Sequence, residues 1–213
     1  MQHLDLDSWP RKKHFHNFLN FSQPFFNITA TVEVTKIKEV SKNLNLSFFL
    51  SYYFVALKVI NVLDPFKYRI REGKVIVHDV IHGGCTVLNA DETFSFAYFD
   101  YFDDFQRYYQ GAQKELDQLK KEPALDPQFH RDDLIHSTAI PWMSFTSFEH
   151  AKRFETNDST PKFAFGKYKE EQGKLFMPIS VSVHHALMDG IHVGKFFKNF
   201  ESLSSKADQI LVP

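Results

Sequence analysis

The sequence predicts an α/β fold, a two-layer sandwich in which a mixed β-sheet packs against helices. Strand-like alternation and helical periodicity interleave along the 213 residues. Several strand candidates follow one another through short turns, which suit antiparallel neighbours, so the sheet is not expected to be wholly parallel. Because no repeat and no linker rich in Gly, Ser or Pro divides the chain, we expect a single domain over residues 1–213.

The first half of the chain predicts a strand, a helix and a hairpin. Residues 27–35 alternate strictly between apolar and polar side chains, as in a half-buried strand. Residues 47–63 are mostly apolar and predict a buried helix. Residues 67–78 predict a hairpin with Glu72-Gly73 as its turn.

The second half continues the interleaving of strands and helices. Its strand candidates are residues 85–88, 93–98, 139–148, 162–169 and 175–183. Its helix candidates are residues 103–121, which carry an apolar stripe, and residues 191–203.

Charge and cysteine content exclude several classes of protein. The formal net charge is −1, whereas a surface for nucleic acid or an anionic membrane needs a basic patch. No apolar run approaches the ~18 residues of a membrane helix, and the polar N-terminus lacks the apolar core of a signal peptide. The single Cys85 cannot form an internal disulfide. We therefore expect a cytoplasmic protein without nucleic-acid or membrane partners.

The most informative segment is PISVSVHHALMDGIHVGKF at residues 178–196. Its alternation predicts a strand with His184 on the serine-bearing side and, if the strand continues, His185 on the buried side. Two histidines where a strand leaves the sheet suit catalysis, because the scaffold is rigid and the edge is open. From spacing alone, two alternatives stay open: core histidines with Asp189 as a helix cap, and a metal site.

Longer motifs favour catalysis. HHALMDG at 184–190 matches the HHxxxDG motif of chloramphenicol acetyltransferases, which peptide-synthetase condensation domains and dihydrolipoyl acyltransferases share. Other stretches resemble the chloramphenicol acetyltransferase family in its order: SWPRKKHF at 8–15, DETFSF at 91–96, AIPWMSFTSF at 139–148 and GKY at 166–168. The chain resembles this family from about residue 8 to residue 200, which implies the CoA-dependent acyltransferase fold.

The resemblance implies direct transfer of an acetyl group from acetyl-CoA to a hydroxyl of chloramphenicol, without a metal. His185 matches the general base, and imidazole suits neutral pH because its reference pKa is about 6.5. Asp189 matches an aspartate that pairs with an N-terminal arginine, here Arg11, and this pair holds the motif. Thr138 matches a serine that donates to the oxyanion, and the adjacent Ser137 is expected to point the other way.

Two sets of binding residues also follow from the resemblance. The acceptor pocket is implied to be apolar, with Phe18 and Phe94 at matching positions and Asn17 where the family often carries phenylalanine. Members of the family are homotrimers with active sites between subunits, so a homotrimer is expected. The residues that match the CoA site are Tyr168, Lys167 and Trp142.

Other hypotheses stay open. Asn17, Thr138 and Ala164 depart from the family, and they leave a different small hydroxyl compound as an alternative acceptor. A catalytically silent homologue that only binds ligands is a further alternative, which the intact HHxxxDG motif disfavours. Cys85 permits a cysteine nucleophile with a histidine base, although cysteine is more often a buried apolar residue.

Overall fold

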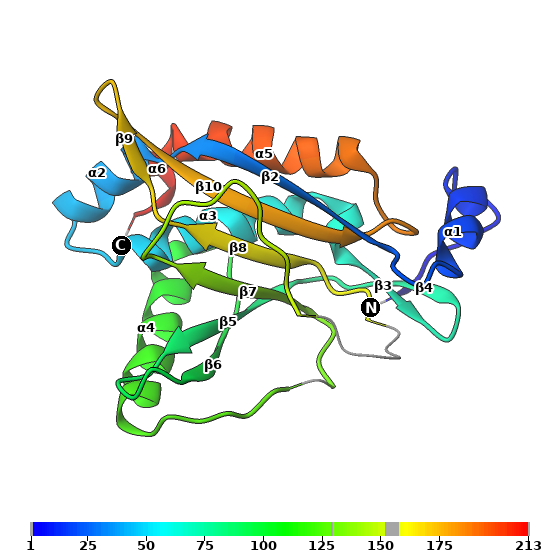
Figure 1. Cartoon of the computed structure of the whole chain (residues 1–213), viewed down its shortest axis with the longest axis horizontal. Helices are drawn as coiled ribbons and strands as arrows, with labels where there is room; N and C mark the ends of the chain where they lie inside the picture. Colours follow the sequence, from blue (N-terminus) through cyan, green and yellow to red (C-terminus); the bar gives the residue numbers. More distant parts are fainter. Residues whose placement is uncertain (1, 129, 152–157, 213) are drawn as a thin grey trace.

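The computed structural model describes residues 2–128, 130–151 and 158–212 (Figure 1). Its strands are β1 (Gln2–His3), β2 (Phe25–Glu33), β3 (Tyr68–Arg71), β4 (Lys74–Val77), β5 (His82–Leu88), β6 (Phe94–Phe99), β7 (Leu134–Ile140), β8 (Lys162–Gly166), β9 (Lys169–Glu171) and β10 (Lys174–His184). Its helices are α1 (Lys12–Leu19), α2 (Thr35–Asn43), α3 (Phe48–Val62), the 3-10 helix η1 (Asp64–Lys67), α4 (Phe105–Lys121), α5 (Gly190–Ser204) and α6 (Ala207–Ile210).

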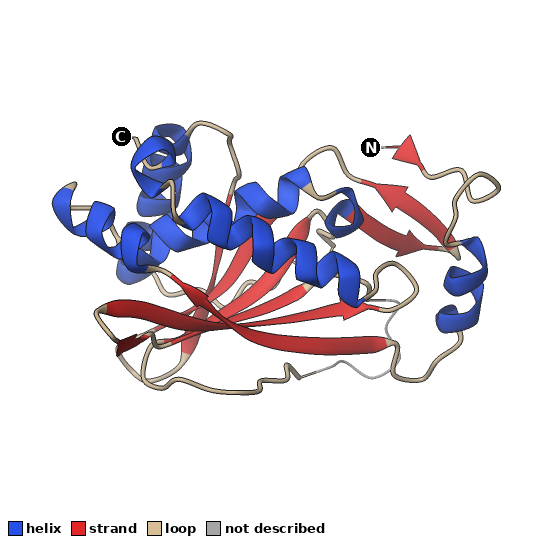
Figure 2. Cartoon of the chain, turned by 90° about the horizontal axis from the view of Figure 1, so that it is seen from above, coloured by secondary structure: helices blue, strands red, loops and turns tan. Residues whose placement is uncertain are grey.

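Within these residues the main sheet contains seven strands and is mixed. The order is β2-β10-β8-β7-β5-β6, and β9 pairs with β10 outside this path. β7 runs parallel to β5 and β8, whereas the other neighbours are antiparallel. A smaller sheet has the order β1-β4-β3. The long helices cover one face of the main sheet, so the predicted two-layer α/β sandwich is confirmed (Figure 2).

The side chains of β10 define the two faces of the sheet. Ile179, Val181 and Val183 are fully buried in the apolar core beneath the helices. Ser180 and Ser182 therefore lie on the opposite face, since successive side chains of a strand alternate. The Ser180 hydroxyl donates to the carbonyl oxygen of Phe148 at 3.1 Å, which ties a loop to that face.

Several predicted elements are confirmed. The strand at residues 27–35 is β2, and the helix at residues 47–63 is α3, whose cap Ser47 accepts a hydrogen bond from the Leu50 amide. The predicted hairpin is formed by β3 and β4, and both turn residues have positive φ, 49° at Glu72 and 70° at Gly73. α3 is apolar because it packs between the sheet and helices α2, α4 and α5.

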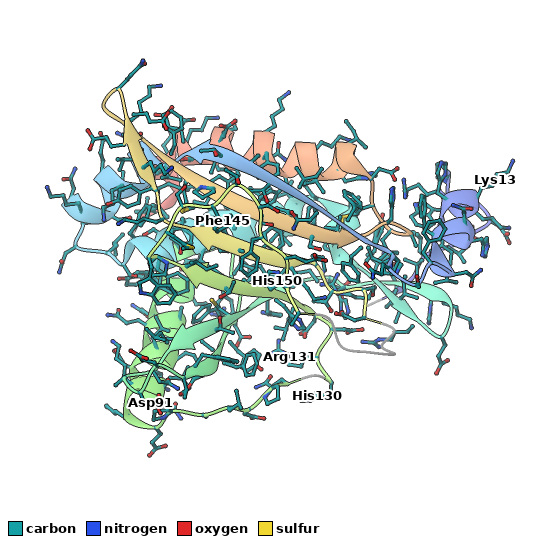
Figure 3. All side chains as sticks on the ribbon, viewed as in Figure 1. Lys13, Asp91, His130, Arg131, Phe145 and His150 are labelled. Carbon is teal, nitrogen blue, oxygen red and sulfur yellow. The ribbon has the colours of Figure 1, made fainter. Side chains whose placement is uncertain are left out.

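The strand predicted at residues 139–148 is wrong. β7 begins earlier, at Leu134, and ends at Ile140, because Pro141 has no N–H to donate to a strand ladder. The chain then crosses the face of the sheet opposite the helices as a loop that carries Phe145 and His150 (Figure 3). Phe145 packs so closely on Gly166 that a Cβ there would lie 2.8 Å from its ring.

In the part of the chain that the structure describes, no helix combines the length and apolar character that a membrane span requires. The same residues bring no three His, Cys, Asp or Glu side chains together in a way that suits a metal ion.

Candidate active site

The HHxxxDG segment forms a tight turn between β10 and α5. The strand ends at His184, whose carbonyl oxygen accepts hydrogen bonds from the amides of Leu187 and Met188 at 3.0 and 3.1 Å. The next residue, His185, donates its amide to the carbonyl oxygen of Pro24 at 2.8 Å, which fixes the turn to the start of β2. The backbone around His185 is therefore held on two sides.

The His185 imidazole lies between aromatic rings and remains partly open. It stacks on Phe18 with ring centroids 3.9 Å apart and planes 6° apart, and Phe26 lies 4.7 Å away. Its side chain is 35% exposed. The expected placement of His185 on the buried side is wrong, because β10 ends one residue earlier and the alternation stops there.

Arg11 and Asp189 form the predicted ion pair. Their side chains are in direct contact, and a second guanidinium nitrogen of Arg11 donates to the carbonyl oxygen of His185 at 2.9 Å. The other carboxylate oxygen of Asp189 lies 3.2 Å from Nδ1 of His185, off the line of a straight hydrogen bond. Burial lowers the pKa of Arg11 from its ordinary value. One guanidinium thus contacts both the motif carboxylate and the backbone of the histidine.

Asp189 is also the N-cap residue of α5, the alternative that spacing had left open. His192 takes part in this cap, because its Nδ1 accepts a hydrogen bond from the Asp189 amide at 2.9 Å. The aspartate is therefore both a cap and a partner of Arg11, and the two interpretations are compatible.

His184 differs from its neighbour. It lies on the serine-bearing side as predicted, is 5% exposed, and its Nδ1 accepts from the Ala186 amide at 3.2 Å. Burial, helped by the positive charge of Lys162 nearby, lowers the pKa of His184 to about 4. A buried neutral imidazole that already accepts a backbone hydrogen bond suits a structural role, whereas His185 is the more accessible of the two.

Three predicted site residues, Thr138, Phe94 and Trp142, line one pocket of about 620 Å³. The pocket lies between the ends of β5, β6 and β7 and the last turns of α4. Ser137 points the other way, as expected, and its hydroxyl bonds to Tyr53 at 2.8 Å and to the Gly84 carbonyl oxygen at 2.9 Å.

The pocket and His185 lie far apart within one chain. Thr138 is in register with Ala164 on β8, and Ala164 is in register with Ser180 on β10. Thr138 is therefore two strands away from β10 and level with a position four residues before His184. At normal sheet spacings His184 is about 10 Å from Thr138 across the strands and about 13 Å along them, and His185 lies one residue further on. Among the predicted binding residues, Phe18 packs against His185, whereas Phe94 and Trp142 line the pocket together with Thr138.

The remaining predicted residues lie outside the pocket. Tyr168 packs edge-on against Phe48 with centroids 5.6 Å apart, and the Lys38 ammonium lies 5.6 Å from the Tyr168 ring. Lys167 is exposed, and its amide donates to the Met143 carbonyl oxygen at 2.9 Å. Asn17 is an exposed residue of α1.

The structure disfavours a cysteine nucleophile. Cys85 is 1% exposed in the core on the helix side of the sheet, and burial raises the pKa of its thiol to about 12. A nucleophilic cysteine needs a lowered pKa and access to substrate.

Two residues of the site carried no sequence signal. Phe26 packs on His185 because β2 pairs with β10, and the Thr86 hydroxyl lies 2.8 Å from that of Thr138 because β5 pairs with β7. Both contacts depend on strand pairing, which a single sequence does not reveal.

The fold is that of the CoA-dependent acyltransferases: a mixed sheet with helices on one face and a histidine pair where β10, a strand paired on both sides, leaves the sheet. The family model described as chloramphenicol acetyltransferase matches residues 1–201. The chain therefore belongs to the chloramphenicol acetyltransferase family.

Individual relatives agree with this assignment. A Klebsiella sp. protein named chloramphenicol acetyltransferase is 30% identical over 93% of this chain and 91% of its own length. A solved chloramphenicol acetyltransferase structure superposes with a TM-score of 0.85 at 29% identity, covering 94% of this chain and 98% of the other. The dihydrolipoamide acetyltransferase of Azotobacter vinelandii shares the fold alone, at 15% identity and a TM-score of 0.68, with 94% and 89% covered.

We expect Arg11→Ala to lower kcat about tenfold, because misplacing a reacting group by even an ångström slows catalysis. The pair is only partly buried, with side chains 13% and 34% exposed, so the loss of stability should be nearer 1–2 than the roughly 3–5 kcal/mol of a buried pair. Steady-state kinetics and thermal melting measure both effects. Arg11→Lys keeps the charge but loses the forked geometry, so its kcat and stability should lie between those of the original protein and those of Arg11→Ala. An Arg11→Ala protein with unchanged kcat and melting temperature would contradict the assignment.

Proposed function

We propose that the chain transfers an acetyl group from acetyl-CoA to a hydroxyl of chloramphenicol, with His185 as the general base. The main support is the His185 imidazole, which is partly exposed, stacked on Phe18 and backed by Asp189. Family membership and the names of the relatives support the substrate pair. Residues 1–213 are proposed to form a single acetyltransferase domain.

The proposed reaction uses the two nitrogens of His185 differently. Nδ1 faces Asp189, so Nε2 is left to take the proton from the acceptor hydroxyl as its oxygen attacks the thioester carbonyl. The negative charge that develops on the carbonyl oxygen is stabilised by the Thr138 hydroxyl. Collapse of the intermediate breaks the carbon–sulfur bond, and the departing CoA thiolate receives the proton from the imidazolium. No acyl-enzyme forms.

The reaction needs Thr138 and His185 at the same acetyl group, and we propose that a second copy of the chain supplies one of them. In support, the two lie on different parts of the sheet within one chain. Apolar side chains that line the pocket are unusually open, with Leu88 54%, Phe94 48% and Trp142 62% exposed. Contact with another subunit would cover them, and the predicted homotrimer provides such a contact.

The proposed CoA site contains Tyr168, Lys167 and Trp142. An aromatic pair formed by Tyr168 and Phe48 lies beneath the Lys38 ammonium, which is 4.8 Å from the Phe48 ring. Aromatic faces next to cations suit a nucleotide with phosphates. Trp142 lines the pocket, and the Lys167 amide bonds to Met143, the residue after Trp142. The bound CoA is therefore proposed to run from Tyr168 towards the pocket.

An assay with purified protein, acetyl-CoA and chloramphenicol tests the proposal. We expect release of CoA thiol that depends on chloramphenicol and appears together with acetylated product. The control is chloramphenicol that already carries an acetyl group on the hydroxyl that accepts it in the reaction, and this compound should give no release of CoA thiol. Absence of turnover with chloramphenicol would contradict the proposal.

A different small hydroxyl acceptor is the second candidate, motivated by the departures at Asn17, Thr138 and Ala164. A panel of hydroxyl compounds in the same assay separates the two, since turnover with another compound alone favours it. The cytoplasmic location stays a prediction from the sequence.

A further inference from the structure

A pair of hydroxyl groups lies in the wall of the pocket. The Oγ1 atoms of Thr86 and Thr138 are 2.8 Å apart, and either atom can be the donor. The two residues are in register on the parallel strands β5 and β7, and both line the pocket. The hydrogen bond therefore involves the Thr138 hydroxyl, the group that is proposed to stabilise the oxyanion.

The strand neighbours of Thr138 single out Thr86. On β8 the residue in register with Thr138 is Ala164, which has no hydroxyl, and on β5 it is Thr86. Ser137 does not serve instead, because its hydroxyl bonds to Tyr53 and Gly84 on the other face of the sheet. Of the two in-register neighbours, Thr86 alone is able to orient the Thr138 hydroxyl by a hydrogen bond.

The direction of this hydrogen bond decides what Thr138 offers to the pocket. Each hydroxyl has one proton to donate and two lone pairs to accept with. If Thr138 donates to Thr86, its proton is used within the pair and no donor is left for an oxyanion. If Thr86 donates to Thr138, the Thr138 proton is free to point into the pocket.

We propose that Thr86 is a positioning residue for acetyl transfer: its hydroxyl donates to Oγ1 of Thr138 and directs the Thr138 proton at the developing oxyanion. This inference rests on the proposed function. A hydroxyl that accepts one hydrogen bond is polarised and becomes a better donor. The bond also selects among the rotamers of the β-branched Thr138 side chain. No covalent bond to hydrogen is made or broken in the pair.

Removing the Thr86 hydroxyl tests the inference. We expect Thr86→Val to lower kcat about five- to tenfold, the size of one modest hydrogen bond, while both KM values stay within about twofold. Thr86→Ser keeps the donor and should restore kcat to within about twofold of the original protein. Thr31→Val is the matched control, since it makes the same substitution on β2, outside the pocket, and should leave kcat unchanged.

A double-mutant cycle separates positioning from a general structural effect. Once Thr138→Val has removed the hydroxyl to be directed, adding Thr86→Val should change kcat no further. If Thr86 only supports the fold, the two losses multiply instead. Thermal melting of each variant shows whether it folds, and Thr86→Ala replaces Thr86→Val if the valine does not fit.

Unchanged kcat in Thr86→Val, multiplied losses in the double variant, or a serine variant as slow as the valine variant would each overturn the inference. The original protein and His185→Ala are assayed in parallel. If the original protein does not acetylate chloramphenicol, the proposed function fails and the inference falls with it. If it does and Thr86→Val matches it, the inference alone fails.

Discussion

His185→Ala should lose nearly all turnover, by about 10²–10⁴ in kcat, which is the range for removal of a general base. An alcohol attacks a thioester poorly while it keeps its proton, and alanine cannot accept one. The expected loss lies in kcat, because the rings around the site and the pocket wall remain in place. Steady-state kinetics with acetyl-CoA and chloramphenicol measure it.

Stability should change little in the same variant. The His185 side chain is 35% exposed, and its main packing contact is the stack on Phe18. Loss of such a contact is worth about 0.5–1.5 kcal/mol, or a few degrees of melting temperature for a chain of this size. The control is His3→Ala, which removes an exposed histidine from β1. A folded His185→Ala protein with ordinary kcat would show that another group is the base.

Thr138→Val should lower kcat by about 10²–10³, because it removes the proposed oxyanion donor. Valine has nearly the shape of threonine, so the pocket keeps its size and KM for chloramphenicol should stay within a few-fold. Thr138→Ser keeps the hydroxyl without the methyl group and should retain most of the activity. Kinetics of the three proteins, with circular dichroism to check folding, make the comparison.

Two results would contradict the role of Thr138. A Thr138→Val protein with kcat within threefold of the original would mean that other donors stabilise the oxyanion. A large rise in KM with unchanged kcat would mean that the hydroxyl binds the acceptor in the ground state.

The elements that the sequence predicts best are those whose pattern is local. β2 and β10 alternate over many residues, and α3 begins at a capping serine. No local pattern indicates α1 and α2, which are eight and nine residues long and lack a capping side chain. The strand expected at residues 139–148 missed the effect of Pro141.

The site shows the same division. His185, Asp189 and their turn are contiguous, and the motif indicates them directly. Arg11 came from the family resemblance, and its contact with the distant Asp189 is in the structure as predicted. Thr86 and Thr138 are 52 residues apart and meet through a parallel strand pair, which no local pattern records.

The separation of His185 from the Thr138 pocket has a consequence for mixtures of variants. Suppose that His185 of one copy meets the Thr138 pocket of another copy. A chain without the imidazole then still carries an intact pocket, and a chain without the threonine hydroxyl still carries an intact base. When the two inactive proteins assemble together, they would restore activity at every boundary where an intact imidazole of one chain faces an intact pocket of the other. An isolated copy, however well folded, would be silent, so activity would vanish on dilution below the concentration that keeps the copies together.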